Sequence, residues 1–151
     1  MQRTLVLLKP DAVSRGLIGE VIVRLENKGL KFVAMKMIHV DNDLAARHYT
    51  EHVDKPFFPK LRNFITSTPI VALVVEGEDV IDFVRNLMGS TNPIDAAPGT
   101  IRGDLAMSIG PNLVHGSDSL ESAQKEIALF FSPTEIFDYE RDIDHWLNEA
   151  P

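Results

Sequence analysis

The chain has 151 residues, of which 44% are hydrophobic and 25% charged, and it contains no cysteine. These values fit a single globular domain over residues 1–151, and they exclude a disordered chain, a disulfide scaffold and a cysteine nucleophile. The net charge of −7 argues against nucleic-acid binding, which needs clustered positive charge. Because no apolar run approaches the ~20 residues of a spanning helix, we expect no membrane partner and a cytoplasmic location.

The first half of the chain predicts two strands and two helices. An aliphatic run at 4–8 predicts a buried strand, and apolar residues at helical spacing predict a helix over 17–27 that stops before a glycine. A second strand is expected over 32–40. The acidic cluster at 41–43 then supplies capping residues for a helix that extends to His52.

The second half begins with a helix over 59–66 and the most apolar strand of the chain, 70–75. A helix is predicted over 79–88, where the apolar residues form one stripe. Residues 89–103 are rich in Gly, Pro, Ser and Asn, and they predict a long loop of the kind that is often functional. A short edge strand is expected over 105–109.

A polar segment, 112–119, precedes a predicted helix over 120–131, and the serine and aspartate at the end of that segment can cap it. Gly116 is expected to adopt a positive φ there and to let the backbone approach a ligand. Residues 132–151 predict a C-terminal tail that packs on the domain or on a neighbouring subunit. Strands that alternate with helices in this order favour an α/β or α+β sandwich.

His115 is the candidate nucleophile of the polar segment. A neutral imidazole can attack phosphorus at neutral pH without first losing a proton, and the start of the next helix favours a nearby anion. On that helix Ser119, Ser122 and Glu126 share one face, so Glu126 could orient one imidazole nitrogen while the other meets the substrate. The alternative is a loop histidine beside an ordinary helix cap, and residue types alone leave it open.

Several motifs along nearly the whole chain resemble those of the nucleoside diphosphate kinases. The most specific is N-L-V-H-G-S-D-S at 112–119, which is similar to the active-site signature of that family. The others are T-L-V-L-L-K-P at 4–10, R-G-L-I-G at 15–19, K-P-F-F at 55–58, N-P at 92–93 and P-G-T-I-R-G-D at 98–104. The resemblance implies a ferredoxin-like sandwich, in which helices cover a four-stranded antiparallel sheet.

The same resemblance implies an activity. A nucleoside triphosphate would phosphorylate His115, and a nucleoside diphosphate would then collect the phosphoryl group, in a ping-pong reaction of broad base specificity. Tyr49 and Glu126 would set the position of His115, and Ser117 would support Glu126. The nucleotide would be held by side chains from several segments: Lys9, Arg85, Thr91 and Arg102 at the phosphates, Lys9 and Asn112 at the ribose 3′-hydroxyl, and Phe57, Leu61 and Ile109 at the base.

The resemblance also implies a cofactor and an assembly. Mg²⁺ is the expected cofactor, held mainly by the phosphates of the nucleotide and not by protein ligands. The loop around Pro93 and the tail through Trp146 resemble those of hexameric members. A homohexamer is therefore expected, with a homotetramer as the alternative.

Two other functions stay open on the sequence. Residues 48–52, His-Tyr-Thr-Glu-His, match the H-x-x-E-H motif of zinc proteases if both histidines lie one helical turn apart. A third, acidic ligand and a zinc-dependent hydrolase activity would then be expected. The other alternative is a regulatory module without chemistry, because ferredoxin-like sheets often bind small ligands only.

Overall fold

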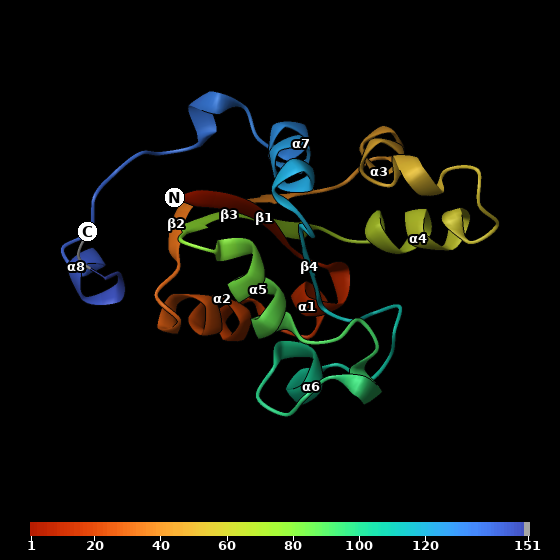
Figure 1. Cartoon of the computed structure of the whole chain (residues 1–151). Coiled ribbons are helices and arrows are strands. Elements are labelled where there is room, and N and C mark those ends of the chain that lie inside the picture. Colours follow the sequence, from red (N-terminus) through yellow and green to blue (C-terminus); the bar gives the residue numbers. More distant parts are fainter. Residues whose placement is uncertain (150–151) are drawn as a thin grey trace.

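The computed structural model, which describes residues 1–149, contains a four-stranded antiparallel sheet with helices on both faces (Figure 1). The strands are β1 (Gln2–Leu8), β2 (Lys31–Ile38), β3 (Ile70–Gly77) and β4 (Val114–Gly116), in the order β2-β3-β1-β4. Every neighbouring pair is antiparallel. The predicted ferredoxin-like sandwich is therefore confirmed.

Helices cover both faces because residues along each strand alternate between them. Leu5 and Leu7 of β1 belong to one apolar cluster, and Val6 and Leu8 belong to the other. The first cluster packs under α3 (Asn42–His48), α4 (Phe58–Ile65) and α7 (Leu120–Phe130). The second packs under α1 (Pro10–Ser14), α2 (Ile18–Asn27), α5 (Val80–Met88) and α6 (Ile101–Leu105). Short 3-10 turns lie at η1 (Thr50–His52), η2 (Pro93–Asp95) and η3 (Pro133–Glu135).

Capping side chains fix the starts of the two helices that carry parts of the site. Asp41 accepts a hydrogen bond from the backbone amide of Leu44 at 2.8 Å, where α3 begins. Ser119 accepts one from the amide of Ser122 at 3.1 Å, where α7 begins. Both predicted caps are confirmed. Thr100 caps α6 in the same way, within a stretch that the sequence predicted to be a loop.

The predicted edge strand over 105–109 is wrong. Leu105 is the last residue of α6, and among the described residues the next strand begins only at Val114. Leu105 and Ala106 pack on the core at the end of α6, but Met107 and Ile109 are 90% and 61% exposed, so the rest of this apolar run is not part of a buried strand. The fourth strand, β4, instead lies inside the segment predicted to be a loop, because its backbone pairs with β1.

Gly116 has a role other than the predicted one. Its φ is not positive, and the left-handed conformation in this segment belongs to Leu113, with a φ of 76°. A Cβ atom on Gly116 would lie 3.0 Å from Val84 Cγ1 and 2.9 Å from Met88 Cε, both on α5. The glycine therefore lets β4 lie close against α5.

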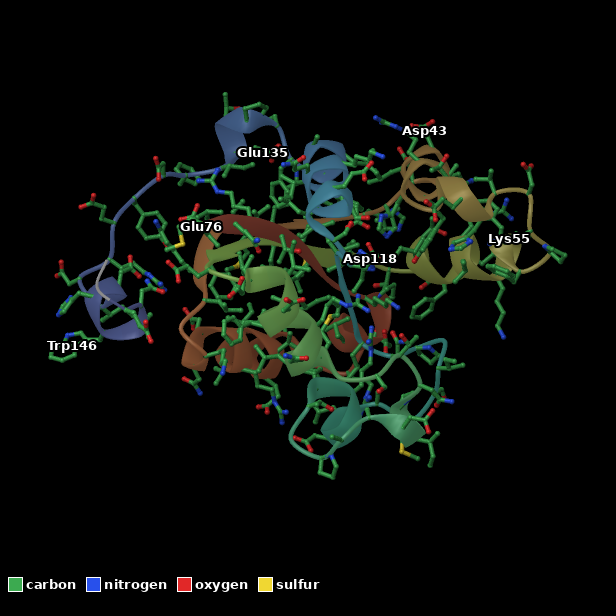
Figure 2. All side chains as sticks on the ribbon, in the orientation of Figure 1. Asp43, Lys55, Glu76, Asp118, Glu135 and Trp146 are labelled. Atoms are coloured by element: carbon green, nitrogen blue, oxygen red, sulfur yellow. The ribbon has the colours of Figure 1, made fainter. Side chains whose placement is uncertain are left out.

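The segment after α7 runs along β2, which is the edge strand of the sheet at the end opposite β4 (Figure 1). The backbone amide of Phe137 donates a hydrogen bond to the carbonyl of Val33 in β2 at 2.8 Å. The segment ends with α8 (Asp144–Leu147), where Trp146 is 80% exposed and lies far from Asp118 (Figure 2). Within residues 1–149, none of the helices combines the length and the apolar character needed to cross a membrane.

Candidate active site

The pairing of β4 with β1 decides where the His115 side chain points. His115 lies opposite Leu7 in the register. Directly opposite residues of an antiparallel pair project to the same face of the sheet, so His115 emerges with Leu7 beneath α3 and α7. A slip of one residue would turn the imidazole toward α5 instead. Strand register is thus the first requirement of the site.

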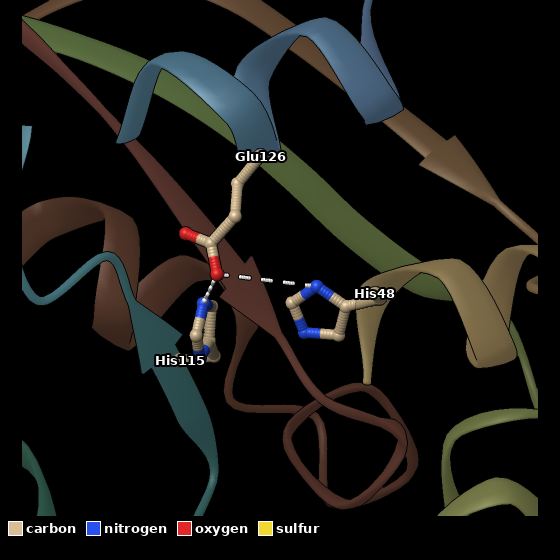
Figure 3. A group of neighbouring side chains, drawn as sticks. All are labelled: His48, His115 and Glu126. Atoms are coloured by element: carbon tan, nitrogen blue, oxygen red, sulfur yellow. Dashed lines mark hydrogen bonds and ion pairs between the residues drawn. The ribbon is translucent and has the colours of Figure 1, made fainter. Parts of the chain in front are cut away.

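Glu126 of α7 holds the His115 ring, as Figure 3 shows. Its Oε1 lies 3.0 Å from Nε2 of His115, and its Oε2 accepts a hydrogen bond from the hydroxyl of Ser117. Burial alone would raise the pKa of Glu126, but the hydrogen bonds from His115 and Ser117 outweigh it and hold that pKa below its ordinary value. Because an ionised carboxylate only accepts hydrogen bonds, Nε2 carries the imidazole proton and Nδ1 carries the lone pair.

His48, the last residue of α3, completes this cluster (Figure 3). Its side chain is only 3% exposed, and its Nδ1 lies 4.0 Å from Glu126 Oε1 without a hydrogen-bond partner. Its ring stands edge-on to that of His115, with 4.9 Å between the ring centres. Burial and, second, the neighbouring His115 lower the pKa of His48 to about 3, so its imidazole is neutral.

The zinc-protease alternative fails on this geometry. The helix α3 ends at His48 and a separate 3-10 turn begins at Thr50, so His48 and His52 do not share one helical face. His48 points into the protein, whereas the ring of His52 packs beside Phe57, with 5.3 Å between ring centres. Within residues 1–149, the side chains that could hold a metal together are His48, His115 and Glu126, a group that leaves out His52.

Tyr49 lies in the wall of a cleft of about 480 Å³ that also reaches His115 and Glu126. The cleft runs between the segment from α3 to η1 on one side and α7 on the other. Burial and, second, the charge of Glu126 raise the pKa of Tyr49 to about 12. The phenol therefore stays protonated and can donate a hydrogen bond near the imidazole.

Lys9 and Asn112 are joined directly. Lys9 follows the last residue of β1, and its ammonium donates a hydrogen bond to Asn112 Oδ1 at 2.7 Å. Asn112 is buried, and its amide nitrogen donates to the carbonyl of Thr91 at 3.0 Å. Burial and, second, the charge of Arg102 lower the pKa of Lys9 to about 8. With one donor engaged, the ammonium keeps two more for an anion.

Arg102 is a buried cation that ties α6 to two other backbone segments. Its guanidinium donates to the carbonyls of Gly89, Asn112 and Val114 at 3.0, 3.3 and 2.7 Å. Burial and the neighbouring Arg85 lower its pKa, yet a guanidinium remains charged in proteins. Three of its five N–H groups are used, so two remain for a phosphate.

Asp11 was not among the residues that the sequence singled out. Its Oδ2 accepts a hydrogen bond from the backbone amide of Leu113 at 3.0 Å. This bond holds the left-handed turn of Leu113, which separates Asn112 from β4. No local signal could have found it, because 102 residues separate the two partners.

The side chains predicted to contact the base are less constrained. Phe57 and Ile109 are 48% and 61% exposed, and Leu61 on α4 is half-buried. Phe57 contacts the ring of His52 and the ammonium of Lys55. Among the described residues, no hydrogen bond or ring contact joins these three apolar side chains to His115. The structure thus gathers His115, Glu126 and the predicted cations Lys9 and Arg102 in one region. The three apolar side chains are partly or mostly exposed and lie outside this hydrogen-bonded group.

A ferredoxin-like sandwich that presents a carboxylate-held histidine near buried cations has the architecture of a phosphotransferase. The family model described as nucleoside diphosphate kinase matches residues 2–136. The chain belongs to the nucleoside diphosphate kinase family, and the resemblance found in its motifs is confirmed.

Known relatives match over nearly their full length. The chain is 56% identical to a nucleoside diphosphate kinase of Archaeoglobus fulgidus and 54% identical to one of Desulforamulus reducens, with 99% of this chain and at least 99% of each relative covered. A nucleoside diphosphate kinase from Halobacterium salinarum, solved in complex with CDP, has 53% identity and a TM-score of 0.95 over 98% of this chain and 99% of that one. A family protein from Babesia bovis has 46% identity and a TM-score of 0.95, over 98% and 100% of the two chains.

Proposed function

We propose that His115 accepts the γ-phosphoryl group of a nucleoside triphosphate on Nδ1 and passes it to a nucleoside diphosphate. The observation that supports this most is the hydrogen bond between Nε2 of His115 and Glu126. It fixes the proton on Nε2, so the lone pair that attacks phosphorus belongs to Nδ1.

The first half-reaction forms a bond between Nδ1 and phosphorus and breaks the bond from phosphorus to the leaving oxygen of the nucleoside diphosphate. The ring keeps its Nε2 proton and becomes positively charged. The ionised Glu126 is held in place by Ser117. Its Oε1 lies 3.0 Å from Nε2 of His115 and stabilises the positive charge of the ring. A second nucleoside diphosphate then attacks the phosphorus, and the ring returns to its neutral form. Tyr49 and Glu126 position the ring throughout.

The phosphates are held by cations from three distant segments. Lys9 and Arg102 keep free donors after their internal hydrogen bonds, and Arg85 is exposed beside Arg102. Thr91 adds a hydroxyl from the loop whose carbonyl anchors Asn112. Lys9 and Asn112 form one hydrogen-bonded pair, which we assign to the ribose 3′-hydroxyl.

The base lies against Phe57, Leu61 and Ile109. An exposed aromatic ring can stack on any nucleobase, and these apolar side chains offer no hydrogen bonds to a base edge. Broad base specificity follows. The Halobacterium salinarum relative was solved in complex with CDP, which supports a pyrimidine nucleotide as one of the ligands.

Mg²⁺ enters with the nucleotide, where it offsets phosphate charge. The side chains predicted at the phosphates are cations, and the cluster of His48, His115 and Glu126 offers two nitrogens where Mg²⁺ prefers oxygens. These residues therefore do not fit a protein-held Mg²⁺, and the ion is expected on the nucleotide's phosphates.

The hexamer is the assembly that we propose for this chain. The segment around Pro93 exposes Ile94 at 85%, and Met107 is 90% exposed, which gives a neighbouring subunit apolar surface to cover. Light scattering should give about 100 kDa, six times the 16.8 kDa of one chain. A mass of four chains would reject the hexamer. The cytoplasmic location stays a prediction from the sequence.

Incubation with γ-labelled nucleoside triphosphate tests the proposed phosphohistidine. The wild type should acquire a label that is stable in alkali and lost in acid, and a nucleoside diphosphate should remove it. His115→Ala should acquire none, whereas the control His39→Ala, which changes an exposed histidine, should label normally. An unlabelled wild type would instead favour a regulatory module, and a labelled His115→Ala would assign the phosphoryl group to another residue.

A further inference from the structure

Three side chains beneath α7 have the geometry of a metal site. The ligand atoms of His48, His115 and Glu126 all lie within 4.8 Å of one another. Glu126 Oε1 is 3.0 Å from Nε2 of His115 and 4.0 Å from Nδ1 of His48. A tetrahedral zinc ion with bonds of about 2.0–2.1 Å separates its ligand atoms by roughly 3.3 Å. The observed separations lie on either side of that value, so small side-chain rotations would complete the site.

His48 supplies independent evidence that a ligand belongs here. Its imidazole is 97% removed from solvent, since its side chain is 3% exposed, and Nδ1 is a buried atom without a hydrogen-bond partner. A buried polar atom with no partner is costly and calls for an explanation. Nδ1 is directed at Glu126, so the two side chains face the position that one cation would occupy (Figure 3).

We propose that His48 Nδ1, His115 Nε2 and Glu126 bind one divalent cation of the zinc type, which switches the enzyme off. Two imidazoles and a carboxylate are ligands that Zn²⁺ accepts in open tetrahedral sites, with water in the fourth position. Mg²⁺ prefers six oxygens, so the Mg²⁺ that accompanies nucleotides does not compete.

The inhibition follows from the two nitrogens of one neutral imidazole, and this step rests on the proposed phosphohistidine. Without the cation, Glu126 accepts the Nε2 proton and the Nδ1 lone pair is free. When the cation takes the Nε2 lone pair, the proton moves to Nδ1 through solvent. Nδ1 then has no lone pair with which to form a bond to phosphorus. The cation also takes the Glu126 oxygen that would stabilise the charged ring.

Direct metal binding tests the site without any nucleotide. Chelator-treated protein is titrated with Co²⁺, whose visible absorption reports tetrahedral coordination, and Zn²⁺ is then added to displace it. We expect one ion per chain and an affinity at least tenfold lower in His48→Gln. The control His39→Gln removes an exposed imidazole and should bind as the wild type does. Equal affinity in wild type and His48→Gln would overturn the site.

Inhibition is measured as the initial rate of His115 labelling by γ-labelled nucleoside triphosphate, with and without excess Zn²⁺. Each variant is compared with its own zinc-free rate, so a change in basal activity does not affect the result. Wild type and His39→Gln should lose labelling, and His48→Gln should need at least ten times more Zn²⁺ for the same loss. Equal sensitivity in all three proteins would reject the switch.

A measurement on the wild type covers the case in which His48→Gln does not fold. The chain contains five histidines. In protein with ¹⁵N-labelled histidine, Zn²⁺ should shift the ring nitrogens of His48 and both ring nitrogens of His115 and leave the other three rings unchanged. Shifts on other histidines, or none, would overturn the proposal. Because this readout detects binding alone, it stays informative even if the wild type acquires no label without zinc.

Discussion

The two sides of the site are built on different principles. The inner network, defined as His48, His115, Ser117 and Glu126 with Lys9, Asn112 and Arg102, is buried or half-buried and largely joined by hydrogen bonds. The outer rim, defined as Phe57, Leu61 and Ile109, consists of apolar side chains that are partly or mostly exposed. Chemistry needs atoms held within a fraction of an ångström, whereas stacking tolerates displacement. We therefore expect substitutions in the inner network to reduce stability or catalysis strongly. Substitutions in the outer rim should raise KM slightly, and to the same degree for all bases.

Arg102→Ala should have the largest effect on stability. It removes three hydrogen bonds to the carbonyls of Gly89, Asn112 and Val114 and leaves a cavity in their place. We expect a loss of about 3–4 kcal/mol, or a fall in Tm of roughly 10 °C for a domain of this size. The control is Arg85→Ala on the exposed face of α5, which should change stability by no more than about 0.5 kcal/mol. Equal effects in thermal melts of the two variants would show that Arg102 is not structural.

Glu126→Gln should have the next largest effect, on catalysis. A neutral amide cannot stabilise the positive charge that forms on the His115 ring. If its NH₂ group faces Nε2, two hydrogen-bond donors meet and the ring loses its acceptor. We expect kcat/KM to fall about 100-fold, or roughly 2.7 kcal/mol, with KM little changed. Glu135→Gln, which changes an exposed carboxylate paired with Lys36, is the matched control. Steady-state kinetics with full activity in Glu126→Gln would contradict the positioning role.

The pH dependence of kcat/KM should report Lys9. Its pKa of about 8 means that the ammonium is charged below pH 8 and loses its charge as the pH rises through that value. Since kcat/KM reflects the free enzyme, it should fall about tenfold, or ~1.4 kcal/mol, for each pH unit above 8. Bound phosphates stabilise the ammonium, so kcat should stay flat over the same range.

The profile of Lys9→Arg provides the control for this prediction. A guanidinium does not deprotonate in this range, so the alkaline fall should disappear even if activity is lower throughout. A fall at the same pH in Lys9→Arg would assign the pKa to another group.

Phe57→Ala should have the smallest effect. Loss of stacking on a half-exposed ring should raise KM about fivefold, or ~1 kcal/mol, and by the same factor for purine and pyrimidine nucleotides. Phe83→Ala, which removes an exposed ring on α5, should leave KM unchanged. A penalty confined to one base class would show that the rim reads base edges and would break the comparison between rim and network.

Much of the fold was visible in the sequence. Period-2 and period-3.6 patterns predicted the three long strands and most of the helices, because each of these elements buries one face in the core. β4 was missed, since three residues are too short for a pattern and its pairing partner is more than 100 positions away. The predicted strand at 105–109 was wrong because Leu105 belongs to the end of α6 and the apolar side chains of Met107 and Ile109 are exposed.

The sequence by itself determined the family, the ferredoxin-like sandwich and the residue types of the chemistry, because a signature such as N-L-V-H-G-S-D-S and a run such as Ile70 to Val75 are local. Only the tertiary structure decided which nitrogen of His115 is free, that Arg102 spends three donors on backbone carbonyls, and that His48 faces Glu126 with an unpartnered nitrogen. Each of these facts is a distance between residues that belong to different helices, strands or loops. Such distances are set by strand register and helix packing, which local patterns do not encode.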